Sequence, residues 1–147
     1  MAESNRRVFP GRADQVRAAR QFVSCALPLW AEAMVAELLV SEAATNTLLH
    51  TNSGQPGGAF QVSYTISGQW LRVEVADQGA PTGPARRLHG PEALTGRGLE
   101  LFDSLAPSWG VSESSDGRTV WFELDLHGVQ LHSEQTEADT PGRVAGR

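Results

Sequence analysis

The sequence predicts an α+β domain, a two-layer sandwich in which helices cover one face of a mixed, mainly antiparallel sheet. Two stretches with apolar residues at helical spacing come first along the chain. Two β-hairpins with alternating apolar residues follow, and a short helical stretch separates them. Because each hairpin pairs its strands antiparallel and each helix must bury an apolar side, this order favours one sheet with helices packed on one face.

The first half of the chain supplies the longer helices. Residues 1–12 form a polar, irregular N-terminal segment in this prediction. Apolar residues at helical spacing predict a first helix from Asp14 to Leu27, which Pro28 ends. A second helix, from Ala31 to Thr51, contains no Gly or Pro and is apolar on most sides, so we expect it to be buried within the domain.

The second half supplies the sheet and a glycine-rich connection. Alternation predicts a hairpin of residues 60–66 and 71–75, a short helix at 99–105 and a second hairpin of residues 109–113 and 120–126. Residues 79–98 hold five glycines and three prolines, which predicts a loop or lid. The polar residues 128–147 lack periodicity and predict a disordered tail, so the folded domain is expected at 13–127.

Composition excludes several classes of protein. All 12 basic residues are arginine, which excludes the P-loop lysine, the strand lysine of protein kinases and every lysine nucleophile. A net charge of -5 argues against direct binding of nucleic acid or of an anionic membrane. The single Cys25, expected in the core, permits no internal disulfide, and no signal peptide or membrane span is recognisable. A cytoplasmic protein is expected.

Polar residues interrupt the apolar second helix. Glu42, Asn46 and His50 fall on one side of it, together with several leucines and a valine. A buried carboxylate or amide is costly unless it has a partner or a ligand. Periodicity leaves an alternative open, in which Glu42 and Asn46 are exposed and Val40, Ala44 and Leu48 face the core instead.

Two further features lie after the first hairpin and before the short helix. Strand parity sends Asp77 to the same inward face as Val75, and Gly79 then allows a sharp turn or a close ligand. An ordinary turn at the end of a strand is the alternative there. Gly96 and Gly98 open the short helix, where free backbone N–H groups favour an anion, although a flexible connection explains them as well.

Together these features form an ordered constellation: Glu-x-x-x-Asn on a helix, Asp-x-Gly-x-Pro after a strand, and Gly-x-Gly-Leu at a helix start. The constellation resembles the GHKL ATP-binding family of gyrase B, histidine kinases and mismatch-repair ATPases. More narrowly, it is similar to the small bacterial anti-sigma factor serine/threonine kinases. The resemblance runs from about Phe9 to Leu126 and implies a Bergerat-type ATP-binding fold.

The resemblance implies a role for the residues at these positions. Asp77 accepts the adenine amino group and Gly79 admits the base. Asn46 supplies an oxygen ligand to Mg²⁺, and Glu42 acts as general base toward the attacking hydroxyl. The nucleotide-binding positions that complete this set for ATP or ADP are His50 on the second helix, Gly96, Arg97, Gly98 and Leu99 at the phosphates, and Thr119 near the adenine edge.

The partners also come from the resemblance. It implies a sigma factor that is sequestered and a STAS-domain anti-sigma antagonist that is phosphorylated, and it leaves open whether the protein forms a homodimer. Leu94 stands where some kinase members carry a basic residue, so the sequence supports nucleotide binding better than phosphoryl transfer. A nucleotide-dependent switch without phosphoryl transfer and an interaction module without nucleotide are the alternatives.

Overall fold

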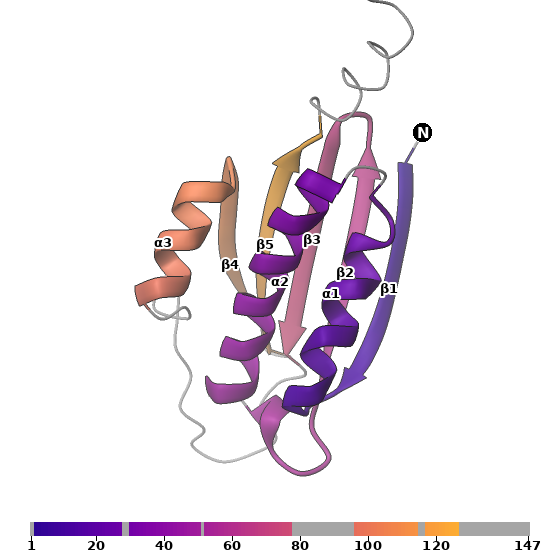
Figure 1. The fold of residues 1–147 in the computed structure, drawn as a ribbon. Helices are drawn as coiled ribbons and strands as arrows, with labels where there is room; N and C mark the ends of the chain where they lie inside the picture. The colour runs from indigo at the N-terminus through magenta and orange to yellow at the C-terminus, as the bar shows by residue number, and fades with distance from the viewer. Residues whose placement is uncertain (1, 28–29, 51, 78–95, 115–116, 127–147) are drawn as a thin grey trace, which may run out of the picture.

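The computed structural model describes residues 2–27, 30–50, 52–77, 96–114 and 117–126, which fold into five strands and three α-helices (Figure 1). In chain order the strands and helices are β1 (Ala2–Pro10), α1 (Val16–Ser24), α2 (Trp30–His50), β2 (Ala59–Ser67), β3 (Trp70–Asp77), α3 (Gly96–Leu105), β4 (Ser108–Ser114) and β5 (Gly117–Asp125). Short 3-10 turns at Ala13–Gln15 and Asn52–Gly54 precede α1 and follow α2. The predicted disordered tail at 128–147 lies outside the described residues.

The strands form one sheet in the order β1-β2-β3-β5-β4, and each of the four pairings is antiparallel. Both predicted hairpins are present, as β2–β3 and β4–β5. The first turns at Gly68, whose φ of 61° suits a residue without a Cβ. The described structure confirms the predicted α+β class and two-layer arrangement.

The first strand corrects the prediction of an irregular N-terminal segment at residues 1–12. Residues 2–10 pair with the whole length of β2, from Ala2 opposite Ser67 to Pro10 opposite Ala59. Of these nine residues only Phe9 is buried, because β1 lies at the edge of the sheet. An exposed edge strand needs no apolar alternation, so its sequence carries little strand signal.

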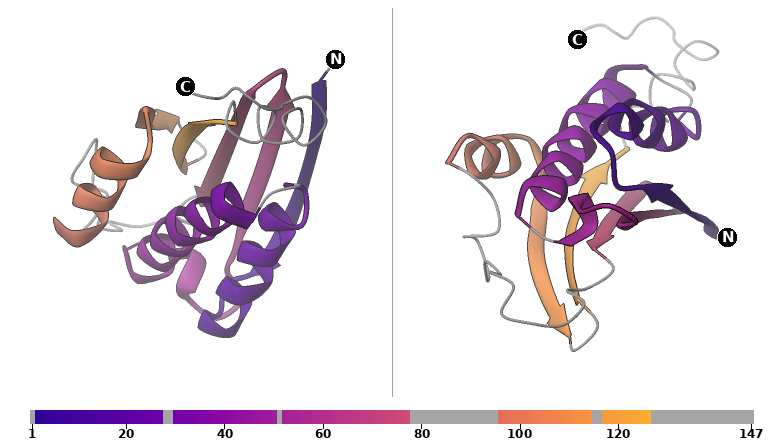
Figure 2. Two further views of the ribbon diagram at one scale, coloured as in Figure 1. Left: turned by 45° about the horizontal axis from the view of Figure 1, so that its top comes forward. Right: turned by 90° about the horizontal axis from the view of Figure 1, so that it is seen from below.

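Helices α1 and α2 lie against one face of the sheet, with α3 at the β4 side (Figures 1 and 2). Helix α2 lies between its neighbours and contacts both α1 and α3. This position explains why α2 is apolar on most sides, as predicted. The core between the layers contains the buried rings of Phe9, Phe60, Phe102 and Phe122.

The helix boundaries agree with the sequence except at two places. The first helix is shorter than expected, because residues 13–15 form a 3-10 turn and the α-helix ends at Ser24. Helix α3 begins at Gly96, three residues inside the segment predicted as a loop, and residues 78–95 lie outside the described part. Cys25, expected in the core, is exposed just beyond the end of α1.

The sheet face opposite the helices carries a polar network centred on Arg72. Its guanidinium lies 2.9 Å from Glu74, 3.1 Å from Glu123 and 4.2 Å from the ring centroid of Trp121. Partial burial lowers the pKa of Arg72, but its hydrogen bonds to both carboxylates outweigh that effect and raise the pKa above its usual value. This network stabilises the outer face, and none of the predicted site residues belongs to it.

Candidate functional site

Asn46, Asp77 and the start of α3, which carry described members of the predicted site, lie toward one end of the domain. Strand β3 ends there and β5 begins there, beside the C-terminal half of α2, at the lower end of the view in Figure 1. Helix α2 contacts both β3 and α3, and the lower end of α3 is its first turn. Segments far apart in the sequence are therefore brought together by the fold.

Asn46 is the most informative side chain on α2. It is buried, with 3% of its surface exposed. Its Nδ2 donates a hydrogen bond of 2.8 Å to the backbone carbonyl of Glu42, one turn earlier. This bond fixes the amide, and Oδ1 then has no hydrogen-bond partner among the described residues. A buried oxygen in this state is costly, which indicates that a ligand completes it.

Glu42 and His50 flank Asn46 along the same helix. The side chain of Glu42 is half-buried. His50 is the last residue of α2, and its side chain lies outside the described part of the structure. Val40 and Ala44, on the side that the alternative assigned to the core, are buried as well. Both predicted sides of α2 thus contact the interior, because the helix is covered on more than one side.

Asp77 ends β3 with its side chain on the inward face, as strand parity predicts. Its side chain is 1% exposed, and its Oδ1 accepts a hydrogen bond of 3.3 Å from the backbone N–H of Arg118. Its Oδ2 lies 4.0 Å from Nε of Arg118, whose side chain is also 1% exposed. An acidic and a basic side chain therefore meet at the inner end of the sheet.

Arg118 has no role in the sequence-based prediction, although a signal for it exists. Val120, Phe122 and Leu124 point inward on β5, and the same parity turns Arg118 inward. Thr119, expected near the adenine edge, pairs with Ala76 instead and faces the outer side of the sheet. The side chain of β5 that lies beside Asp77 is that of Arg118.

The glycine-rich positions are described only in part. Gly96 and Gly98 lie in the first turn of α3, and Gly98 is buried. The side chains of Arg97 and Leu99 lie outside the described part, as do Gly79 and the predicted lid. The first turn of a helix presents backbone N–H groups that suit a phosphate, so the observed start of α3 is compatible with the predicted role.

Comparison with known proteins identifies the fold family. The family model for the histidine kinase-like ATPase domain matches residues 9–124, which is most of the chain. The chain belongs to the histidine kinase-like ATPase family. It is also 37% identical over 84 residues to an uncharacterized protein of Streptomyces coelicolor, a match that covers 55% of this chain and 76% of that protein.

Membership of the histidine kinase-like ATPase family implies an ATP-binding domain. The five-stranded antiparallel sheet with helices on one face is consistent with that fold. Among the described helices none is long and apolar enough to cross a membrane. Among the described residues no group of three or more His, Cys, Asp or Glu side chains is arranged to hold a metal ion.

The observed amide fits a magnesium ligand of the kind that ATPase-like domains use. Mg²⁺ is a hard cation that takes oxygen ligands and keeps several waters, so one protein oxygen with free lone pairs is sufficient on the protein side. Asn46 Oδ1 is such an oxygen. The rest of the coordination would come from phosphate oxygens and water.

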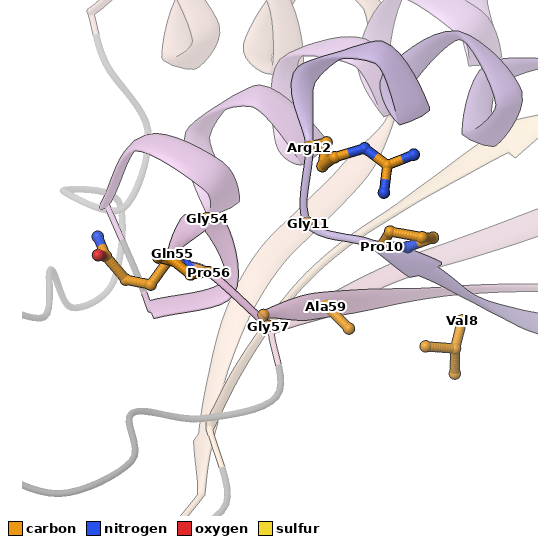
Figure 3. A pocket seen from close by; sticks show the side chains of 10 residues that line it. Val8, Pro10, Gly11, Arg12, Gly54, Gln55, Pro56, Gly57 and Ala59 are labelled. Carbon is orange, nitrogen blue, oxygen red and sulfur yellow. The ribbon is translucent and has the colours of Figure 1, made fainter.

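A hollow of about 680 Å³ lies elsewhere on this ATPase-like domain, between the end of β1 and the loop that precedes β2 (Figure 3). Its lining includes Pro10, Arg12, Gln55 and Pro56 but no carboxylate and none of the predicted site residues. Arg12, its one charged group, pairs with Asp14 at 3.2 Å. Size alone does not make this hollow a nucleotide site. The side chains expected to bind a nucleotide, Asn46 and Asp77, do not line it.

Proposed function

We propose that this protein is an ATP-binding regulator of the anti-sigma type, with serine/threonine kinase activity toward a STAS-domain antagonist and with the capacity to sequester a sigma factor. One observation carries the nucleotide part of the proposal. Asn46 holds a buried amide oxygen without a hydrogen-bond partner among the described residues, in a domain of the histidine kinase-like ATPase family. An oxygen ligand for a phosphate-bound cation is what such a site requires.

The nucleotide would lie between α2, the inner end of the sheet and the first turn of α3. Asp77 would accept a hydrogen bond from the adenine amino group, and Gly79 would admit the base. Gly96 and Gly98 would donate backbone N–H groups to the phosphates, assisted by Arg97 and the positive end of the α3 dipole. His50 and Leu99 are the more peripheral members of the proposed set, and Thr119, which faces the outer side of the sheet, is left out of it.

Magnesium, held by Asn46 and the phosphates when bound, would neutralise phosphate charge and orient the terminal phosphoryl group. Glu42, one turn before Asn46, would take the proton from the serine or threonine hydroxyl that attacks. The chain lacks lysine, so positive charge near the phosphates would otherwise come from arginine and from backbone N–H groups. Phosphoryl transfer in such a site depends on positioning and charge more than on covalent chemistry with the protein.

The partners rest on the family resemblance together with the charge of the chain. A net charge of -5 disfavours direct contact with nucleic acid or with an anionic membrane, so a protein partner in the cytoplasm is proposed. A nucleotide-dependent switch without phosphoryl transfer is the second candidate, because Leu94 stands where some kinase members have a basic residue.

The test is phosphoryl transfer from labelled ATP to a STAS-domain protein encoded beside this one. We expect transfer to a serine or threonine by the wild type and a loss of at least about 100-fold in the Glu42→Gln variant, the usual contribution of a general base. Glu37→Gln, on the same helix, is the matched control and should leave transfer intact. Equal transfer by wild type and Glu42→Gln would remove Glu42 from this role, and nucleotide binding without any transfer would favour the switch.

A further inference from the structure

Strand β1 forms one edge of the sheet, and no described strand pairs with its outer side (Figure 1). Every residue of this strand except Phe9 is exposed. The exposed side chains include Val8, an apolar residue with 51% of its surface in solvent. A free edge presents backbone N–H and C=O groups to which the strand of another chain can be added.

Three observations show which residues of β1 direct their backbone groups outward. At the end of the ladder the N–H of Gly11 donates a hydrogen bond of 2.9 Å to the C=O of Gly58, so odd-numbered residues bond to β2. The N–H of Arg6 instead donates 2.9 Å to Oδ1 of Asn5, beside it on the same strand. Pro10, which has no N–H, is also even-numbered, as expected on the solvent side of an edge strand. The even-numbered residues therefore present their backbone groups at the free edge.

We propose that two copies of this protein pair through β1, antiparallel, with Asn5 opposite Asn5 at a two-fold axis. The axis is perpendicular to the sheet, so the two five-stranded sheets join into one and the helices of both copies lie on the same face. The inference concerns the edge of the domain and does not depend on the proposed nucleotide site.

Charge favours this register. Glu3 and Arg7 are equally spaced about Asn5, so each copy places Glu3 opposite Arg7 of the other, and the symmetry makes two such pairs. Opposite charges directly across two strands stabilise their pairing. These odd-numbered residues form non-hydrogen-bonded pairs at the new interface, where side chains lie closest. In the same register the exposed Val8 lies opposite Ala2, which gives an apolar pair on the other face.

The neighbouring symmetric registers are less favourable. A two-fold axis perpendicular to the sheet places one residue opposite itself, so the registers differ in which residue that is. An axis at Arg6 or at Arg7 places two guanidinium groups directly opposite each other, which destabilises the pairing. An axis at Ser4 makes no pair of opposite charges and leaves Val8 uncovered.

The test is sedimentation equilibrium of the full chain at low salt, where such charge pairs are least screened. One strand pairing is a small interface, so the wild type should form a dimer with a dissociation constant of roughly 1–100 µM. Glu3→Arg and Arg7→Glu should each weaken the dimer at least about 10-fold, because each turns two attractive pairs into two repulsive ones.

Mixing the two variants is the decisive arm. In a dimer of one Glu3→Arg copy and one Arg7→Glu copy, both cross-strand pairs again join opposite charges, so the equimolar mixture should associate as tightly as wild type. Because this result is a gain of association, misfolding of a variant cannot imitate it. Glu100→Arg is the matched control, on the exposed surface of α3 at the β4 side of the sheet, and should dimerise like wild type (Figure 1).

A second test measures the register by oxidation to an intermolecular disulfide. Asn5→Cys should cross-link readily, because the Cα atoms of a non-hydrogen-bonded pair lie about 4.5 Å apart, within the range of a disulfide. Arg6→Cys should cross-link at least about 10-fold more slowly, because its counterpart is displaced along the strand. Cys25 is exposed beyond the end of α1, so both variants also carry Cys25→Ser.

A wild type that stays monomeric up to millimolar concentration would overturn the inference and leave the edge of β1 to a strand of a different protein. A dimer that both charge reversals leave unchanged, or a mixture as weak as its components, would show that the copies do not pair through β1 in this way. Equal rates of cross-linking for Asn5→Cys and Arg6→Cys would overturn the register.

Discussion

Replacing Asn46 by alanine separates the stability of the fold from the function of the site. The substitution removes the hydrogen bond of 2.8 Å to the Glu42 carbonyl, at a cost of about 1 kcal/mol in the free energy of unfolding. It also removes a buried oxygen without a hydrogen-bond partner among the described residues, a gain of about 1–3 kcal/mol. The higher helix propensity of alanine adds about 0.5 kcal/mol, and the small cavity that remains subtracts about 1 kcal/mol.

The expected net effect on the free energy of unfolding lies between a loss of about 0.5 kcal/mol and a gain of about 1.5 kcal/mol, measured by urea denaturation with an unchanged m value. Nucleotide affinity in the presence of Mg²⁺ should fall at least about 10-fold, while affinity in EDTA should not change, because one oxygen ligand has been removed. A weaker site without a matching loss of stability is typical of a residue kept for function.

Ser41→Ala is the matched control for this prediction. Ser41 also donates a hydrogen bond of 2.8 Å to the carbonyl four residues earlier, and its Oγ additionally accepts a bond of 3.3 Å from Arg20. Its loss should lower stability by about 0.5–1.5 kcal/mol and leave nucleotide affinity unchanged. If Asn46→Ala were instead destabilised by more than about 1.5 kcal/mol, Oδ1 of Asn46 would have to accept a hydrogen bond in the wild-type protein without nucleotide. That result would refute the inference that this oxygen awaits a ligand.

Two further predictions concern stability away from the site. Gly11→Ala places a Cβ 1.7 Å from the backbone oxygen of Ser53, so we expect the free energy of unfolding, measured by urea denaturation, to fall by more than about 3 kcal/mol. Gly68→Ala is the control: Gly68 has a φ of 61° and no atom within 4 Å of the added Cβ, so the fall should be only about 1–2 kcal/mol. Equal losses in the two variants would contradict a steric clash at Gly11. Arg72→Met should cost about 1 kcal/mol, since it disrupts the pairs with Glu74 and Glu123. The pKa of Arg72 is raised in the folded state. Its contribution to the free energy of unfolding should therefore be complete below the unfolded-state pKa and be lost only as pH rises through the folded-state pKa. If the difference in stability between wild type and Arg72→Met disappeared near neutral pH, this prediction would be wrong.

The helices and hairpins could be predicted from the sequence because each has a strong local pattern. The 21-residue helix α2 has no Gly or Pro, and strand alternation fixed the inward position of Asp77. Strand β1 could not be predicted, because its exposed residues have no apolar alternation and its pairing with β2 is a contact between distant segments.

The site was predicted in part. Which side of α2 is buried could not be decided from periodicity, because neighbours on several sides cover that helix, and the burial of Asn46 required the structure. Arg118 could have been found from parity on β5, since inward Val120 implies an inward residue two positions earlier. The family resemblance implied a role for Thr119 instead, but Thr119 faces the outer side of the sheet.

The most direct measurement of the central claim is titration of the purified protein with ADP by calorimetry, with Mg²⁺ and then with EDTA, for wild type and Asp77→Asn. The wild type should bind with micromolar to millimolar affinity that falls at least about 10-fold in EDTA, since an oxygen ligand and phosphates share the cation. Asp77→Asn, checked for folding by thermal denaturation, should bind substantially more weakly. Equal affinity for wild type and Asp77→Asn, or binding that is indifferent to Mg²⁺, would contradict a nucleotide site built on Asp77 and Asn46.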